Sequence, residues 1–131
     1  MKKLYFSIAL LLCSHTVYAE NKDLNKAEHS QKNCYVDPDI QRKQIPKTPD
    51  DMSLPNFGQG IIGWGTGAEG TQNKLINLNI IDIQSYKKQG VTLAMIQEWQ
   101  AFYENESKRN TCNPTAPLRA ELMKKIALMW Q

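Results

Sequence analysis

The sequence predicts a mainly α-helical protein, a compact bundle of three or four helices closed by one disulfide. Three observations support this fold class. Apolar residues recur at helical spacing through most of residues 66–129. Residues typical of helix starts and ends separate these stretches. Ahead of them lie an extended segment, residues 34–55, which holds four of the six prolines, and a glycine-rich loop, residues 56–71, which holds six of the seven glycines.

The first 19 residues have the pattern of a secretory signal peptide. Two lysines precede a short apolar run, and Ala19 closes a small-x-small cleavage site. The apolar run is shorter than the roughly 20 residues that span a membrane. We expect cleavage after Ala19, a periplasmic or secreted mature chain and no stable membrane insertion. Cys13 leaves lipidation or an uncleaved anchor as the alternative, although Leu12 is not the small residue that a lipobox requires.

The mature chain is predicted to hold a flexible tether, residues 20–33, and a single small domain, residues 34–131. The tether is almost entirely polar. Removal of the signal takes two of the 16 basic residues and leaves 14 against 13 acidic ones. This nearly neutral balance gives no electrostatic footprint for nucleic acid, so none is expected as a partner.

Two cysteines remain after the signal, Cys34 and Cys112, and the simplest interpretation in an exported chain is one disulfide. A bridge across this separation would stabilise the fold by about 4 kcal/mol in the chain-entropy treatment. The alternative is two free thiols that form half of a metal site. The mature chain offers only His29 as a further soft ligand, so no metal site is predicted.

The glycine-rich loop contains GQGIIG, which matches the dinucleotide-binding pattern G-x-G-x-x-G in form only. That mechanism needs a buried strand running into the loop, and Pro55 stands three residues before Gly58. No Gly-Lys-Ser/Thr follows, so the loop is not a Walker A motif either. We therefore expect no cofactor and interpret the loop as a tight turn.

The first helical stretch follows the loop. Thr66 and Glu69 have the spacing of a capping box. The spacing of Ile76, Ile80 and Ile83 predicts one buried face. Asparagine is unfavourable in a helix interior, and positions 77 and 79 are both asparagine. The alternatives are therefore one continuous helix or two short helices. Gly90 is the predicted stop.

Two further helices are better marked. Thr92 is the predicted N-cap of the second, with Val91 and Ile96 as a hydrophobic staple. Its aromatic residues predict the centre of the core. The third helix is predicted to start at Thr115 or Ala116. The faces expected to be buried are Met95, Trp99, Phe102 and Glu106, flanked by Ile96 and Tyr103, and then Leu118, Leu122, Ile126 and Met129.

Acidic residues are the available material for catalysis. Glu69 stands beside the glycine-rich loop, and Glu98, Asn105 and Arg109 share one stripe of the second helix. A carboxylate near a cleft could act as a general acid or base. The simpler interpretation is a helix cap and a solvated face. The helix pair around Gly90 also has the form of a DNA-binding helix-turn-helix, which export and the neutral charge argue against.

Trp64, within GWGTG, has two interpretations. It packs down into the core while the glycines turn the backbone, or it stands exposed over a groove and binds a glycan or peptide. A simple linker would be poor in apolar residues, so a structural or binding role is expected.

Two stretches together resemble a family of small, often exported bacterial domains of unknown function. They are GWGTGAEG, residues 63–70, and GVTLAMIQEWQAFYENESKRNTCNPTAPLRAELM, residues 90–123. The family pattern joins a GWGTG-type loop to WxxFYxNExxRNxxNPxAxxRAxLM. The residues that match are Gly63, Trp64, Gly65, Thr66, Gly67, Trp99, Phe102, Tyr103, Asn105, Glu106, Arg109, Asn110, Asn113, Pro114, Ala116, Arg119, Ala120, Leu122 and Met123. Thr111 departs from it, because the family has proline there. The resemblance covers about the C-terminal half and implies no known activity.

The polar residues of this pattern suggest a site around the turn between the last two helices. They can satisfy the helix ends, or they can bind an anionic group or a peptide. We hypothesise that Trp64, Glu69, Asn105 and Arg109 converge on one surface. The candidate functional surface comprises Trp64, Glu69, Asn105, Arg109, Asn110 and Arg119, with Asn113 beside them.

The function predicted first is a binding domain that engages a protein or a cell-envelope component through the face of the glycine-rich loop. The alternative is a secreted antibacterial effector or hydrolase that uses Glu69 or the stripe of Glu98, Asn105 and Arg109. A periplasmic immunity or inhibitor protein is the third possibility.

Overall fold

The structure is a computed structural model that describes residues 33–131. The predicted signal peptide, and the predicted tether up to residue 32, lie outside the described residues. The elements in chain order are α1 (Leu54–Phe57), the π-helix η2 (Gly58–Ile62), α2 (Gly67–Asn77), α3 (Ile80–Lys88), α4 (Leu93–Arg109) and α5 (Thr115–Leu128). The predicted mainly α class is confirmed. In the described part of the chain, extended pairing is limited to one antiparallel bridge, between Val36 and Asn110.

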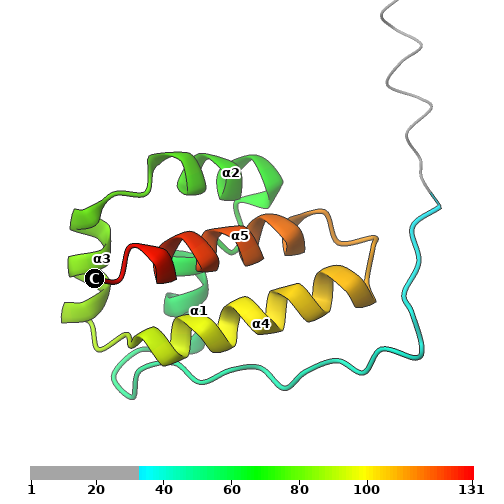
Figure 1. Cartoon of the computed structure of the whole chain (residues 1–131), viewed down its shortest axis with the longest axis horizontal. Helices are drawn as coiled ribbons and strands as arrows, with labels where there is room; N and C mark the ends of the chain where they lie inside the picture. The colour runs from blue at the N-terminus through cyan, green and yellow to red at the C-terminus, as the bar shows by residue number, and fades with distance from the viewer. Residues whose placement is uncertain (1–32) are drawn as a thin grey trace, which may run out of the picture. The chain divides into compact units, whose positions relative to one another are not determined.

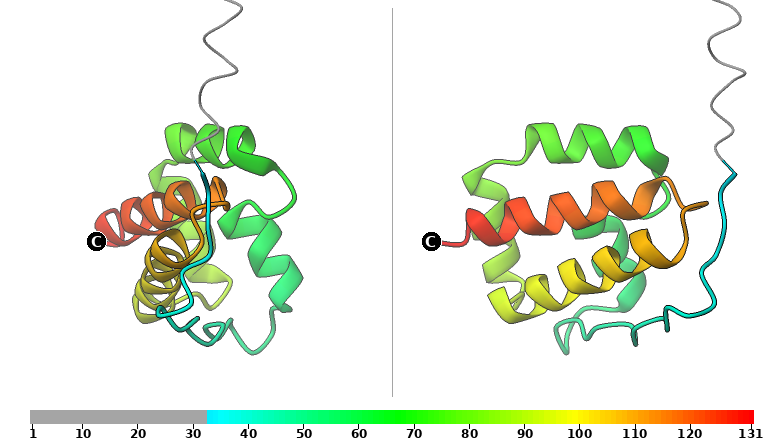
Figure 2. Two further views of the ribbon diagram at one scale, coloured as in Figure 1. Left: turned by 90° about the vertical axis from the view of Figure 1, so that its right-hand side faces the viewer. Right: turned by 45° about the vertical axis from the view of Figure 1, so that its right-hand side comes forward.

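The helices pack around α5. Figure 1 shows α4 and α5 side by side and antiparallel, joined by a short turn. α2 lies on the other side of α5, and the views in Figure 2 also keep α5 between α2 and α4. α3 crosses one end of these helices and leads from α2 to α4. No helix of residues 33–131 is both long and apolar enough to cross a membrane.

Trp99 of α4 is the centre of the core, and its side chain has no exposed surface. The rings of Phe57, Phe102 and Tyr103 lie with their centroids 5.5, 5.5 and 5.9 Å from that of Trp99. Trp64 meets it edge-on at 6.0 Å. The other buried apolar residues are Ile61, Ile62, Leu78, Ile83, Tyr86, Val91, Ile96, Ala116, Leu122, Met123 and Ile126. The prediction that the aromatic helix forms the centre of the core is confirmed.

The start of α2 differs from the predicted capping box. Thr66 occupies the N-cap position, but its hydroxyl donates to the carbonyl of Gly63 at 2.7 Å and caps no helical N–H. Gly63, Gly65 and Gly67 all have positive φ, so the chain turns back on itself and brings the hydroxyl over the loop. The helix begins where the sequence predicts, but the capping roles of Thr66 and Glu69 are wrong.

A capping box forms instead at the start of α3. The side-chain oxygen of Asn79 accepts from the N–H of Ile81 at 2.8 Å, and a carboxylate oxygen of Asp82 accepts from the N–H of Asn79 at 3.0 Å. This arrangement satisfies the free N–H groups of a new helix start. The predicted division of the first helical stretch into two pieces is therefore confirmed.

The prediction that Ile76, Ile80 and Ile83 form one buried helical face is wrong, because the helical stretch breaks between α2 and α3. Ile83 is fully buried, but Ile76 and Ile80 are 63% and 50% exposed. Ile76 belongs to α2 and the other two to α3, so Ile76 and Ile83 cannot share one helical face. Ile80 is the first residue of α3, whose buried residues are Ile83 and Tyr86. Leu78, in the connection, is buried in their place.

The last two helices begin as predicted. Gly90 adopts φ +82° after α3, and the hydroxyl of Thr92 accepts from the N–H of Met95 at 3.2 Å. α5 starts at Thr115. Leu122 and Ile126 are fully buried on its core face. Local sequence signals were sufficient here because each helix has its own cap and its own apolar stripe.

Residues 34–53, which we call the strap, run along α4 in an extended conformation (Figure 1). The predicted disulfide is confirmed and ties the strap to the α4–α5 turn, with the Cα atoms of Cys34 and Cys112 4.7 Å apart. Next to it, Thr111 donates its backbone N–H to the carbonyl of Tyr35 at 3.0 Å and accepts from the N–H of Tyr35 at 2.8 Å. A proline at position 111 could not donate the first of these bonds.

Candidate functional site

A cleft of about 330 Å³ opens beside the aromatic core. The strap, the glycine-rich loop, α4, the α4–α5 turn and α5 all contribute to its walls. The lining residues are Arg42, Ile45, Trp64, Gly65, Trp99, Phe102, Tyr103, Glu106, Asn113 and Arg119. We call it the aromatic cleft. It brings together Trp64 and Arg119, two of the predicted site residues.

Trp64 is part of the core and also a wall of the aromatic cleft. Its indole N–H donates to the hydroxyl of Tyr103 at 2.6 Å. Its ring meets Trp99 edge-on, and the side chain as a whole is only partly buried. The sequence left a buried plug and an exposed platform as alternatives for Trp64. The structure combines them, because one side of the indole packs inward and another faces the cleft.

The indole of Trp64 rests directly on the backbone of Gly58. A Cβ atom at position 58 would lie 2.2 Å from two ring carbons of Trp64. The backbone N–H of Trp64 also donates to the carbonyl of Gly58 at 2.8 Å. Lys74, from α2, donates to the neighbouring carbonyl of Gly60. The prediction of an extended segment to residue 55 and a tight turn after it is wrong here, because residues 54–62 form α1 and η2. The first glycines of the stretch lie in η2, which supports the tryptophan.

Glu106 brings a buried carboxylate to the aromatic cleft, with 5% of its surface exposed. Arg109 donates to both of its oxygens, from Nε at 2.8 Å and from Nη2 at 3.1 Å. Nε of Arg42, from the strap, lies 3.4 Å from the same carboxylate. The hydrogen bonds from Arg109 lower the pKa of Glu106; burial opposes them, and the positive charges of Arg109 and Arg42 add to the lowering. Glu106 is thus ionised at neutral pH, which is the wrong state for a general acid.

Arg119 differs from the two paired arginines. The carbon of its guanidinium lies 5.7 Å from the ring centroid of Tyr103. Its Nε is shielded from solvent and has no hydrogen-bond acceptor within residues 33–131. Burial raises the pKa of Tyr103, while the hydrogen bond from Trp64 and the charge and hydrogen-bonding contact of Arg119 oppose the rise. Tyr103 therefore presents a neutral hydroxyl next to a cation that forms no ion pair within residues 33–131.

Asn105 and Asn110 have structural partners. The side chain of Asn105 accepts from the N–H of Lys43 at 3.1 Å and donates to the carbonyl of Gln41 at 3.2 Å. It fastens the strap to α4 in this way. Asn110 accepts from the N–H of Cys112 at 3.1 Å and shapes the turn that carries the disulfide.

Asn113 both hydrogen-bonds to Thr115 and lines the aromatic cleft. Its side-chain oxygen accepts from the N–H and the hydroxyl of Thr115, at 3.1 and 2.8 Å, and so caps the start of α5. It also lines the aromatic cleft. Asn113 is therefore a helix cap that a ligand in the cleft could touch.

The hypothesised convergence holds for only part of the predicted set. Trp64 lines the aromatic cleft. Arg109 does not line it, but it binds the carboxylate of Glu106, which does. Glu69 is exposed in the first turn of α2 and does not line the cleft. Asn105 faces the strap. The acidic residues proposed for catalysis, Glu69 and Glu98, are both exposed and outside this cleft.

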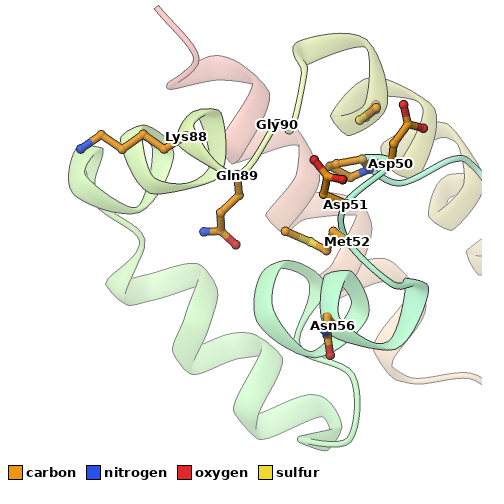
Figure 3. A pocket seen from close by; sticks show the side chains of 9 residues that line it. Asp50, Asp51, Met52, Asn56, Lys88, Gln89 and Gly90 are labelled. Carbon is orange, nitrogen blue, oxygen red and sulfur yellow. The ribbon is translucent and has the colours of Figure 1, made fainter.

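A second hollow, of about 670 Å³, lies between the end of the strap, α1 and the α3–α4 turn (Figure 3). It is larger but carries no aromatic side chain among its lining residues. Asp50 and Asp51 are its acidic groups, and Figure 3 shows Lys88 directed away from them. None of the predicted site residues lines it, and the aromatic cleft is therefore the better candidate.

Sequence reasoning did not select Arg42, Tyr103 or Glu106 as functional residues. Glu106 was recognisable as a charged residue on the apolar face of α4, a signal of a buried partner. Arg42 carries no such signal, because it reaches the cleft only through the path of the strap. Within residues 33–131 no three side chains of the types His, Cys, Asp and Glu gather closely enough to hold a metal ion.

Residues 32–130 match a protein family described as a domain of unknown function, DUF4951. The chain belongs to this family. A solved structure, the NMR structure of a protein from Acinetobacter baumannii, is 56% identical to this chain. The match covers 73% of this chain and 92% of that one, with a TM-score of 0.60. No curated protein matches. The membership confirms the resemblance to a family of unknown function and places the whole described domain, strap included, within DUF4951.

Proposed function

We propose that this protein is an exported binding domain whose aromatic cleft engages a protein or another cell-envelope component. The observation that carries the proposal is Arg119, whose Nε has no acceptor among residues 33–131, beside the partly exposed Trp64 in one cleft. Tryptophan, tyrosine and arginine are the residues most enriched at binding hot spots. The cleft volume of about 330 Å³ lies at the lower end of the range of ligand sites, roughly 300–1,000 Å³.

Two further features support export as part of this proposal. The N-terminal residues have the composition of a signal peptide. The Cys34–Cys112 disulfide fits an oxidising compartment, where such bonds form and persist. An immunity or inhibitor protein would be a binding domain of this same kind, distinguished by the identity of its partner.

The geometry favours binding over hydrolysis. Both oxygens of Glu106 are occupied by Arg109. Glu69 and Glu98 are exposed and do not line the aromatic cleft, and Glu98 instead lines an adjoining hollow that shares Ile45 and Phe102 with it. A hydrolase needs a carboxylate that can exchange a proton beside the substrate, and the cleft places no free carboxylate in that position among the described residues.

The indole N–H resonances of the three tryptophans provide a direct test of this proposal. Trp64 and Trp99 line the aromatic cleft, whereas Trp130 lies near Lys87 at the C-terminal end. Fractions of a cell-envelope extract would be added to the isotope-labelled mature protein. We expect at least one fraction to shift the Trp64 and Trp99 signals and leave Trp130 in place. Shifts of equal size at Trp130, or no shift with any fraction, would contradict the proposal.

A further inference from the structure

We infer that the aromatic cleft takes a ligand that carries a carboxylate on an aromatic or apolar body, with Arg119 as the group that binds the carboxylate. The inference rests on the proposed function and specifies the ligand class of the same site. Charge, hydrogen-bonding capacity and shape each contribute to it, and each comes from different residues of the cleft.

The charge of the cleft favours an anion. Arg42 and Arg119 line the cleft together with one carboxylate, that of Glu106, which Arg109 also contacts. Arg109 pairs with both oxygens of Glu106, and Arg42 lies within ion-pair distance of one of them. Arg119 has no carboxylate within that distance in the described part of the chain. The cleft therefore holds more positive than negative charge, and an anionic ligand would be complementary to it.

The hydrogen-bonding capacity of Arg119 points to a carboxylate in particular. Arg109 shows the arrangement within this protein, since its Nε and Nη2 bind the two oxygens of Glu106 side by side. The Nε of Arg119 has no acceptor among the described residues. Arg119 is only partly buried, so its side chain can turn to present this edge to a ligand. Such rotamer changes are common on binding.

The shape of the cleft favours one small aromatic or apolar group. Trp64 forms a partly exposed aromatic wall, and Ile45 of the strap is 52% exposed beside it. Phe102 also lines the cleft, but it is 4% exposed and the guanidinium carbon of Arg42 lies 5.7 Å from its ring centroid. Flat aromatic walls pack well against another ring, in stacked or edge-on geometry. A volume of about 330 Å³ suits a single aromatic acid or one chain end.

Defined probes test the inference on the unaltered protein. The probes are 3-phenylpropionate and its neutral analogue 3-phenylpropanamide, which differ only in the charged group. Each is titrated while the Trp64 indole resonance is followed. We expect the carboxylate to bind at least about tenfold more tightly than the amide, the effect of losing a hydrogen bond to a charged group. Equal affinity of the two probes would overturn the carboxylate inference and leave the proposed binding function standing.

A matched pair of variants tests the role of Arg119. Arg119→Gln removes the charge, and Lys124→Gln removes a charge from an exposed position of α5 outside the aromatic cleft. We expect Arg119→Gln to weaken 3-phenylpropionate binding at least about tenfold, with amide binding unchanged, and Lys124→Gln to affect neither. If Arg119→Gln fails to fold, the comparison of acid and amide on the unaltered protein still decides the question.

A peptide probe distinguishes the two possible sources of the carboxylate, the C-terminus of a polypeptide and a small free acid. N-acetyl-Gly-Gly-Phe with a free C-terminus is compared with the same peptide ending in an amide. Tighter binding of the free peptide than of 3-phenylpropionate indicates a chain end as the natural ligand, and equal or weaker binding indicates a free acid. Either result supports the carboxylate only when the free peptide binds more tightly than the peptide amide, and equal affinity of these two peptides would overturn the inference. If neither acid moves the Trp64 resonance while envelope fractions do, this inference is wrong and the proposed function survives; if nothing moves it, both fail.

Discussion

Replacement of Gly58 by alanine should uncouple Trp64 from its hydrogen bond. An added Cβ would lie 2.2 Å from the Cδ2 and Cε3 atoms of Trp64, whereas carbon atoms in contact stand about 3.5–4.0 Å apart. The indole must therefore move outward by more than about 1 Å. Its bond to Tyr103, now 2.6 Å, would then exceed the usual limit for a hydrogen bond.

Three contributions determine the loss of folding stability in Gly58→Ala, and the sign of each is known. Forced repacking of a well-packed group costs about 1–3 kcal/mol, and the lost hydrogen bond costs about 1 kcal/mol. Position 58 has a helical conformation, with φ −60° and ψ −47°, so alanine recovers about 0.5–1 kcal/mol there. The expected net loss is about 1–3 kcal/mol, or roughly 5–20 °C in Tm for a domain of this size.

Urea denaturation followed by circular dichroism measures this loss. The matched control is Gly60→Ala in the same π-helix, where an added Cβ meets nothing within 4 Å. It should leave the stability unchanged or raise it by up to about 1 kcal/mol. In a Trp64→Leu background the cost of Gly58→Ala should disappear, because the clash is gone. An equal effect of both alanines, or a cost that persists without the tryptophan, would refute the reasoning.

Three further predictions concern charge and covalent closure. Because hydrogen bonds from Arg109 hold the pKa of Glu106 below its usual 4.5, the stability that Glu106 contributes is present above that pH and lost as the pH falls further. Glu106→Gln should lower the free energy of unfolding by about 1.5–3 kcal/mol at neutral pH. In a plot of urea midpoint against pH, the variant should also lose less stability than the parent below pH 4.5; an equal loss in both proteins would contradict the pairing of Glu106 with Arg109. Burial, with a smaller contribution from Asp82, raises the pKa of Tyr86 from 10.0 to about 12. Stability should therefore decline as the pH rises through this interval, less so in Tyr86→Phe, as thermal melts at several pH values would show. Joint replacement of the disulfide cysteines by serine should cost about 4 kcal/mol, and a urea midpoint close to that of the parent would speak against closure by the strap.

Features that depend on neighbouring residues were predictable from the sequence. Thr92 caps α4 and Gly90 ends α3 because each acts within one turn of its own helix. The role of Thr66 was not predictable in the same way. Its spacing to Glu69 is that of a capping box, but positive φ at three nearby glycines redirects its hydroxyl into the loop.

Local sequence patterns did not predict which residues meet in the aromatic cleft. Tyr103 and Arg119 meet because α4 and α5 are antiparallel neighbours, and Trp64 joins them through its hydrogen bond to Tyr103. Arg42 joins them because the side chain of Asn105 accepts one hydrogen bond from the backbone of the strap and donates another to it, and these bonds hold the strap against α4. These are contacts between elements, and no periodicity within one element encodes them.

Photocrosslinking in living cells tests most directly the claim that the aromatic cleft is the binding site. A photoreactive phenylalanine analogue replaces Ile45, which is 52% exposed in the cleft wall, or Ile76, which is 63% exposed on α2 and outside the cleft. The account predicts a discrete adduct from position 45 and none from position 76. Equal adducts from both positions, or an adduct from position 76 alone, would contradict it.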